Sequence, residues 1–334
     1  MNTICKFADI DTYLLYFIDL SSVLTLTTIS KDQNKHILNL DFIKELCILV
    51  QKYGYNNIID NAAKHNYLSL INWLVDAKYD FKYTMRAINS ASENGHIDIL
   101  NWFLNSNYEF KYSIYSIDLA SANGHIDILN WFANSKYKFK YTGNAIDFAA
   151  EKGNIDVLNW FRRKAKSKYK FKYTEYAIDN AAANAHIDVL NWFANSEYEF
   201  KYSTEAIDNA IEEGYIDVLN WFAESKYEFI YTKYAIAYAA GNGHIDILNW
   251  FANSKYEFNY IKSAIYGALK GQNLEILKWC EESKYEIKYD EDEDDDDDDE
   301  IFEVLDSDYA ETLRHELGPN SRILKLWDYM NAKN

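Results

Sequence analysis

The stretch Ala239-Ala240-Gly241-Asn242-Gly243-His244-Ile245-Asp246-Ile247-Leu248-Asn249-Trp250-Phe251 decides the fold, because most of the chain repeats it. Its tryptophan recurs at intervals of 29 residues, with one interval of 32. The copies are Trp73, Trp102, Trp131, Trp160, Trp192, Trp221, Trp250 and Trp279. A fixed period in this range is typical of a solenoid, in which each unit buries its apolar faces against its neighbours. The sequence therefore predicts an all-α solenoid of stacked helix-turn-helix repeats of about 29 residues.

Each repeat is predicted to begin with a Thr or Ser that caps a short first helix by accepting a free backbone N–H. Within that helix an isoleucine fills the core, and an alanine three residues later allows close helix packing. A glycine then lets the chain leave the helix in a left-handed conformation. Asn66 suits that conformation too, whereas Ala185 and Gln272 fit it less well. The glycines are Gly95, Gly124, Gly153, Gly214 and Gly243.

The second helix of each repeat carries apolar residues on two faces, which indicates a helix packed between neighbours. Burial of its Trp ring is expected to dominate the local energetics. The connector to the next repeat, as in Lys136 to Tyr141, alternates charged and aromatic residues and is predicted to be extended.

The repeats occupy residues 55–289, and the remaining segments differ from them. Residues 1–54 are predicted to be an N-terminal helical cap, because the end unit of a solenoid faces water. Within it, Leu14 to Thr27 resembles a degenerate F-box, the segment that docks a substrate adaptor on a ubiquitin ligase. Residues 290–306 are predicted to be an acidic, disordered insertion. Residues 307–334 follow as a C-terminal capping repeat.

Composition limits the functions that remain. The formal charge is −18, but the run Asp290 to Glu300 supplies −11 of it and leaves −7 for the rest. A mildly acidic body gives no general argument for nucleic-acid binding. Three widely separated cysteines argue against a disulfide framework or a zinc site. No apolar run is long enough to cross a membrane, and residues near the start do not form a signal peptide.

Two charged runs interrupt the pattern. The three extra residues fall in Arg162 to Lys168, where the simplest interpretation is a longer helix end and a solvated loop. The alternatives are a nuclear-import signal or an anion-binding patch extending to residue 172. The acidic run is interpreted as a solvated linker, with binding to a basic partner, or to the 162–172 run, as the alternative.

No catalytic constellation is present in the sequence. Four histidines occupy one equivalent repeat position, which favours a structural role; they are His96, His125, His186 and His244. There is no phosphate-binding or dinucleotide-binding loop and no metal-ligand spacing. An active site needs different residues at one point, whereas this chain repeats the same ones. We therefore expect no enzyme, no cofactor and no metal.

The core Ala-Ala-x-x-Gly-His-Ile-Asp-Ile-Leu-x-Trp-Phe resembles the middle of an ankyrin repeat, over about 70% of the chain. The residue sequence of this core, together with the Lys-Tyr-Glu-Phe-Lys-Tyr connector, is similar to the repeats of the ankyrin-repeat families of giant DNA viruses of the Mimivirus type. The family's Thr-Pro-Leu-His start is replaced, as in Tyr176-Ala177-Ile178-Asp179. We therefore expect a tight extended loop in place of the family's β-hairpin. The resemblance implies a monomeric protein of the host cytoplasm, or of the nucleus if the 162–168 run directs import.

The resemblance also implies that the first helices and the connector tips form a concave binding face. Its variable positions supply the candidate protein-binding residues Arg86, Tyr115, Phe148, Tyr176, Glu205, Tyr234 and Tyr238. Aromatic and Arg side chains are common energetic centres of interfaces, although these Tyr could instead pack along the ridge. The predicted function is a non-enzymatic scaffold that binds a partner protein, from the host on this resemblance. The alternatives are an F-box-like ubiquitin-ligase adaptor, and a binder of basic proteins or nucleic acid through the two charged runs.

Overall fold

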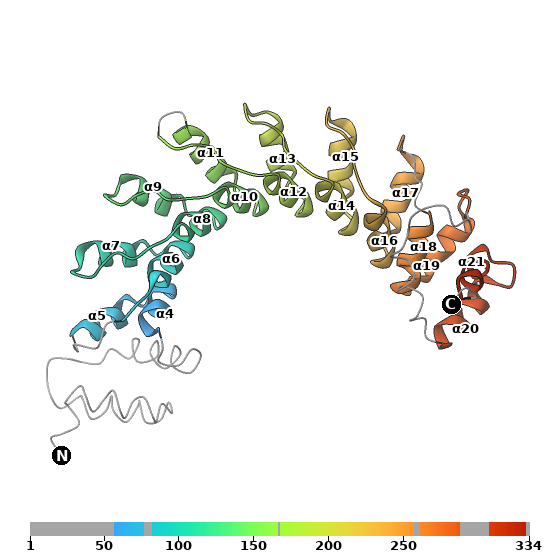
Figure 1. The fold of residues 1–334 in the computed structure, drawn as a ribbon, viewed down its shortest axis with the longest axis horizontal. Coiled ribbons are helices and arrows are strands. Elements are labelled where there is room, and N and C mark those ends of the chain that lie inside the picture. The colour runs from blue at the N-terminus through green and yellow to red at the C-terminus, as the bar shows by residue number, and fades with distance from the viewer. Residues whose placement is uncertain (1–56, 77–81, 166–167, 257–260, 288–306, 332–334) are drawn as a thin grey trace, which may run out of the picture. The chain divides into compact units, whose positions relative to one another are not determined.

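The structure is a computed structural model that describes residues 57–76, 82–165, 168–256, 261–287 and 307–331. The chain forms two compact units, Met1–Thr174 and Glu175–Asn334. Throughout the described ranges the secondary structure is helical and no strand occurs, so the all-α repeat prediction is confirmed (Figure 1). The predicted N-terminal cap, 1–54, and the acidic insertion, 290–306, lie outside the described residues.

In the described part of unit 1, four helix pairs follow one another. They are α4 (Ile58–Lys64) and α5 (Leu68–Asp76), α6 (Met85–Glu93) and α7 (Ile97–Asn105), α8 (Tyr115–Ala122) and α9 (Ile126–Asn134), and α10 (Asn144–Glu151) and α11 (Ile155–Ala165). The even-numbered first helices pack along one another from repeat to repeat. The second helices touch over shorter stretches, and extended connectors join α7 to α8 and α9 to α10 (Figure 1).

Unit 2 repeats this arrangement four times and adds a final pair. Its repeats are α12 (Tyr176–Ala183) and α13 (Ile187–Ala194), α14 (Glu205–Glu212) and α15 (Ile216–Glu224), α16 (Lys233–Gly241) and α17 (Ile245–Asn253), and α18 (Ile261–Lys270) and α19 (Leu274–Glu282). The final pair is α20 (Ser307–Leu317) and α21 (Arg322–Asn331). Each unit is thus a helical-repeat solenoid in which neighbours in sequence are neighbours in space.

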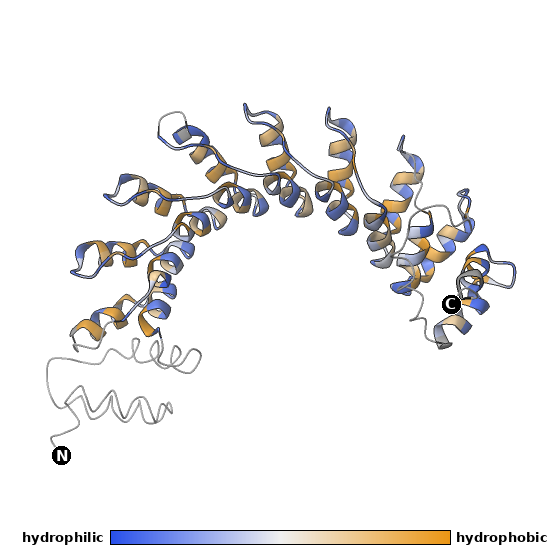
Figure 2. Cartoon of the chain, in the orientation of Figure 1, coloured by the Kyte–Doolittle hydropathy of each residue, from blue (hydrophilic) through white to orange (hydrophobic). Residues whose placement is uncertain are grey.

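The core lies between the two helices of each repeat and between adjacent repeats. The repeated isoleucine and alanine of the first helices are fully buried, as Ile88 and Ala91 illustrate, so their predicted role is confirmed. Hydrophobic residues accordingly occupy much of the second helices, while hydrophilic residues gather at the loop tips (Figure 2). Burying apolar area at about 25 cal/mol per Å² is the main stabilising contribution.

The expectation about tryptophan needs correction. From α7 to α17, the fully buried ring of each second helix is the phenylalanine after the tryptophan, as in Phe103, Phe132 and Phe222. Most of the described repeat tryptophans are only half-buried, Trp160 being the buried exception. The difference arises because the Trp ring lies flat against connector rings, as Trp131 does against Phe110 at 5.4 Å between centroids. Such a ring keeps an edge toward solvent.

Six of the repeat tryptophans instead connect their repeat to the one before it. Its indole N–H donates to the side-chain oxygen of the Asn that precedes the previous Trp, over 2.7–2.9 Å. The pairs are Trp102–Asn72, Trp131–Asn101, Trp160–Asn130, Trp221–Asn191, Trp250–Asn220 and Trp279–Asn249. The repeated Asn-Trp dipeptide is therefore a hydrogen-bond ladder along the second helices.

The turn between the two helices of a repeat has the predicted left-handed conformation. All five repeat glycines have positive φ, between 70° and 83°. Asn66 shares that conformation, and so do Ala185, with φ of 55°, and Gln272, with φ of 53°. A side chain with a Cβ pays about 1–2 kcal/mol to be there, so the repeat architecture imposes this turn even where the residue is unfavourable.

The junction between α16 and α18 is closer than the others. A Cβ placed on Gly267 would lie 1.8 Å from the carbonyl oxygen of Ala237. Only glycine fits there, because a methyl group cannot share the volume of a backbone carbonyl.

We predict that Gly267→Ala lowers the free energy of unfolding by at least about 1–3 kcal/mol, because the added methyl forces the two helices apart. Gly143→Ala is the matched control, since Gly143 has φ of −58° and a Cβ there would meet its nearest neighbour at 3.5 Å. It should be neutral or stabilising by about 0.4–1 kcal/mol. Urea denaturation of both variants checks this, and equal stabilities would contradict the close approach.

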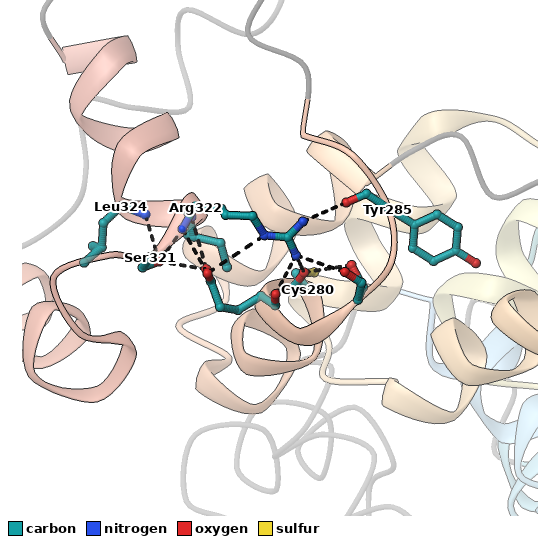
Figure 3. A network of polar contacts seen from close by, with 8 residues as sticks. Cys280, Tyr285, Ser321, Arg322 and Leu324 are labelled. Atoms are coloured by element: carbon teal, nitrogen blue, oxygen red, sulfur yellow. Dashed lines mark hydrogen bonds and ion pairs between the residues drawn. The ribbon is translucent and has the colours of Figure 1, made fainter.

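The final pair is joined to α19 by reciprocal capping (Figure 3). The Arg322 guanidinium donates to the carbonyl oxygens of Cys280 at 2.9 Å, Tyr285 at 3.0 Å and Ser283 at 3.1 Å. In return the Glu281 carboxylate accepts the backbone N–H of Arg322 at 2.9 Å and the hydroxyl of Ser321 at 2.8 Å. The end of α19 and the start of α21 thus satisfy each other's free backbone groups.

We predict that Arg322→Ala destabilises the C-terminal part of unit 2 by about 1–3 kcal/mol, because part-buried carbonyls lose their donor. Lys325→Ala, an exposed change on the same helix, should stay within about 0.5 kcal/mol. Hydrogen exchange of α19 and α21 in the full chain measures both. Unchanged exchange in the Arg322 variant would contradict the capping role.

Candidate protein-interaction surface

The seven candidate residues all lie on first helices, in two equivalent positions. Arg86, Tyr115, Tyr176, Glu205 and Tyr234 stand two residues after the Thr or Ser that opens each repeat, and Phe148 and Tyr238 stand one helical turn further on. In unit 1 the packing of α6, α8 and α10 brings Arg86, Tyr115 and Phe148 into one row. In unit 2 the packing of α12, α14 and α16 does the same for the other four.

Most of these side chains are available to a partner. Tyr115, Tyr176, Tyr234 and Tyr238 are 48–53% exposed, and Arg86 and Glu205 are exposed as well. Phe148 is the exception, because it is half-buried in its row. Tyr234 and Tyr238 lie four residues apart on α16, so their rings share one face of that helix.

Two apolar residues on the same surface are not among the sequence candidates. Met85 is 52% exposed and Ile114 is 37% exposed, and each directly precedes a candidate residue. Each stands one residue after the opening Thr84 or Ser113, so its place in the repeat could have identified it. With Arg86 and Tyr115 they give unit 1 an apolar surface beside a cation.

A hydrogen-bonded clamp between repeats holds this row in place. At six junctions the side chain of an Asp or Asn on one first helix accepts the backbone N–H of the next repeat's opening Thr or Ser, over 2.8–3.1 Å. Where the acceptor is Asp, the hydroxyl also donates to its second oxygen, over 2.6–2.8 Å. The pairs are Asp60–Thr84, Asn89–Ser113, Asp118–Thr142, Asp147–Thr174, Asp179–Ser203 and Asp208–Thr232.

The clamped hydroxyl also fixes the backbone of the candidate residue. The Thr84 hydroxyl accepts the N–H of Arg86 at 3.1 Å, and the Ser113 hydroxyl accepts that of Tyr115 at 3.3 Å. The Ser203 hydroxyl accepts the N–H of Glu205 at 3.2 Å. The predicted N-cap is thereby confirmed at Thr84. It is wrong for Ser113 and Ser203, because α8 and α14 have Ile114 and Thr204 as their N-caps and the Ser hydroxyl stands one residue earlier. Backbone position on this surface is therefore set by the preceding repeat.

The clamp changes at the junction between α16 and α18. Ala237 takes the place of the Asp, and Ile261 takes the place of the Thr or Ser. Both polar partners are replaced together, so neither leaves a buried group unsatisfied. This is also the junction at which Gly267 allows the closest helix approach.

Burial controls the ionisation of the clamp. Desolvation raises the pKa of Asp118, Asp179 and Asp208 above the usual carboxyl value of 3.8. Hydrogen bonds from the next repeat's Ser or Thr offset part of that shift, because they favour the carboxylate. Burial and the two donors therefore act in opposite directions on the pKa of these three carboxyls.

The histidine position also connects neighbouring repeats. The His96 ring bonds the carbonyl oxygen of Lys64 at 3.0 Å, and at the equivalent position Asn154 donates to the carbonyl oxygen of Ala122 at 2.7 Å. Burial lowers the pKa of His96. A Cβ on Gly95 would lie only 2.7 Å from Nδ1 of His125, so that ring packs on the left-handed turn of the preceding repeat. These contacts support the structural role predicted for this position.

The rest of the described chain offers little other chemistry. A shallow groove of about 530 Å³ lies between α15 and α17. Asn220 and Trp250, which line it, already bond each other, and Lys255 reaches the carbonyl oxygen of Ala223 at 3.4 Å. No cluster of metal-ligating side chains occurs among the described residues. Burial raises the pKa of the Cys280 thiol to about 12, so it stays protonated.

Neither a protein-family model nor a curated protein matches this chain. None of the helices in the described part is long and apolar enough to cross a membrane.

We predict that the triple variant Asp118→Asn, Asp179→Asn, Asp208→Asn reduces the pH dependence of stability. Between pH 3.8 and the raised pKa, the folded chain retains protons that the unfolded chain has released, so wild-type stability falls as pH rises. The variant lacks this contribution, and Asn89 already forms the same clamp with Ser113.

Urea denaturation at a series of pH values from about 3.8 to 7 tests this. The unfolding free energy of wild type minus that of the variant should decrease as pH rises. A difference that stays constant or increases would contradict the desolvated clamp.

Proposed function

We propose that this protein is a non-enzymatic scaffold that binds a partner protein on the exposed face of its first helices. The observation that carries the proposal is the contrast between a constant framework and a variable surface. The clamp, the ladder and the buried isoleucines recur almost unchanged. The exposed position beside the clamp changes freely, from Arg86 to Tyr115 in unit 1 and from Tyr176 to Glu205 in unit 2.

The chemistry of that surface supports recognition of a protein. Tyr and Arg contribute large contact areas with few rotatable bonds, and both are common among residues that dominate binding energy. The four candidate tyrosines leave about half of their area in solvent. That exposure favours an interface over the alternative in which the rings only pack along the ridge.

We also propose that the repeats are of the ankyrin type and that the partner is a host-cell protein. Support for the first point comes from the helix pair, the left-handed turn and the extended connector of each repeat. The second point depends on the sequence resemblance alone, as does a location in the host cytoplasm. The F-box-like segment of the adaptor alternative lies outside the described residues.

The experiment compares partner capture by the full-length chain with capture by the variant Tyr176→Ala, Tyr234→Ala, Tyr238→Ala, which changes only unit 2. Proteins captured from host-cell lysate are identified by mass spectrometry, and the affinity of each purified partner is then measured. We predict at least a tenfold weaker affinity, because loss of about 1.4 kcal/mol gives that factor. Exposed tyrosines contribute little to the fold, so the thermal midpoint should not change.

The matched control is Asn134→Ala with Glu224→Ala, two exposed residues at the ends of second helices. This control should bind each partner as wild type does. Equal affinity of the tyrosine variant and the control for every partner would contradict the proposed surface.

A further inference from the structure

Two connectors of unit 1 reverse the charge that the other connectors carry. The third residue of the connector motif is glutamate in most repeats, as in Glu109, Glu199 and Glu228, but lysine at Lys138 and Lys170. These lysines belong to the consecutive connectors 136–141 and 168–173. From residue 136 to residue 172 there are 11 Lys and Arg against 3 Asp and Glu, in a chain with a formal charge of −18.

The two connectors lie side by side. The ring of Phe139 stacks on that of Tyr169 with 4.4 Å between centroids, and the Tyr141 hydroxyl donates to the carbonyl oxygen of Lys170. The Lys168 ammonium reaches the carbonyl oxygen of Ala133, near the end of α9, at 3.2 Å. Charges separated by about 30 residues in sequence therefore share one surface.

This surface, which we call the lysine patch, consists of six exposed lysines and the end of α11. The lysines are Lys136, Lys138, Lys140, Lys168, Lys170 and Lys172. Four of them lie over tyrosine rings. Lys140 is 4.7 Å from the Tyr112 centroid and Lys172 is 4.8 Å from that of Tyr141, while Lys136 and Lys168 lie over the following residues, Tyr137 and Tyr169, at 5.5 and 5.1 Å. Such contacts restrict the side chains while leaving the ammonium groups exposed.

No carboxylate of either connector neutralises the patch, since neither contains Asp or Glu. Among the three acidic residues between them, Asp147 is buried and bonded to Thr174, and Glu151 pairs with Lys152 at 2.9 Å. Like charges held together in this way weaken the fold through repulsion. A structural role does not account for them, because the equivalent connectors fold with glutamate.

We propose that the lysine patch is a binding site for an acidic polypeptide segment, separate from the first-helix surface. A short run of Asp and Glu would place its carboxylates over two adjacent connectors, neither of which contains a carboxylate that would repel them. A long nucleic acid would extend beyond the patch to Glu109, whose connector lies against 136–141 through the stacking of Phe110 on Tyr137 at 4.1 Å. Tyr112 and Tyr141 also have a lysine over one ring face, which leaves less room for base stacking.

The probe is a fluorescent peptide with the sequence of residues 290–300, titrated with the full-length chain and followed by anisotropy. The test variant is Lys138→Glu with Lys170→Glu, because Glu109 and Glu199 occupy the same position in other repeats without disturbing them. The control is Lys226→Glu with Lys255→Glu, which makes the same charge change on two connectors of unit 2. Glu197, at the first position of its own connector, shows that glutamate is accepted there.

We expect the wild-type chain and the control to bind the peptide, with affinity falling as salt is added. The test variant should bind at least about tenfold more weakly, because charge reversal at the centre of the patch replaces attraction with repulsion. Equal binding by the test variant and the control would overturn the proposal. Tighter binding of a single-stranded oligonucleotide than of the peptide, lost in the same test variant, would overturn the choice of ligand.

The chain's own acidic run has the chemistry of the probe and could compete with it. A second protein, in which Asp290 to Glu300 are all changed to Asn or Gln, removes that competition. Peptide binding by this protein but not by wild type would support the patch, with the chain's own run as its occupant. Absence of peptide binding by both proteins would refute it.

Discussion

The structure depends on hydrogen bonds that each repeat can make only with the next one. The opening Thr or Ser of a repeat donates to an Asp or Asn of the repeat before it, as Thr142 does to Asp118 at 2.6–2.9 Å. Along the second helices, each Trp of the ladder donates to the Asn of its predecessor. A single repeat would leave these groups without partners, so stability is a property of pairs of repeats.

This dependence explains how the surface can vary while the fold stays constant. The clamp fixes the backbone N–H of Arg86 and Tyr115, but it does not involve their side chains, so the residue type at these positions can change. Connector rings similarly fix the backbone beside Lys138, where other repeats carry glutamate. One framework can therefore carry two surfaces of variable sequence, one on the first helices and one on the connectors.

Much of the fold follows from the sequence, because a 29-residue period, a buried isoleucine and a left-handed glycine are local signals. The exposure of the Tyr candidates follows from the same register. The burial of Phe103 in place of Trp102 does not, because adjacent apolar residues on a sandwiched helix cannot be ranked without their neighbours. The clamp joins residues 24 or 27 positions apart, and the Arg322 cap falls where the period is interrupted, so neither has a local signature.

The central claim, that each repeat is stabilised through its junctions, is tested most directly by native-state hydrogen exchange of the full chain carrying Asp179→Ala. This substitution removes the acceptor for Ser203, which lies on the next repeat. The account predicts faster exchange in both α12 and α14, with α6 and α8 unchanged. Faster exchange confined to α12, or spread equally over all the described helices, would contradict it.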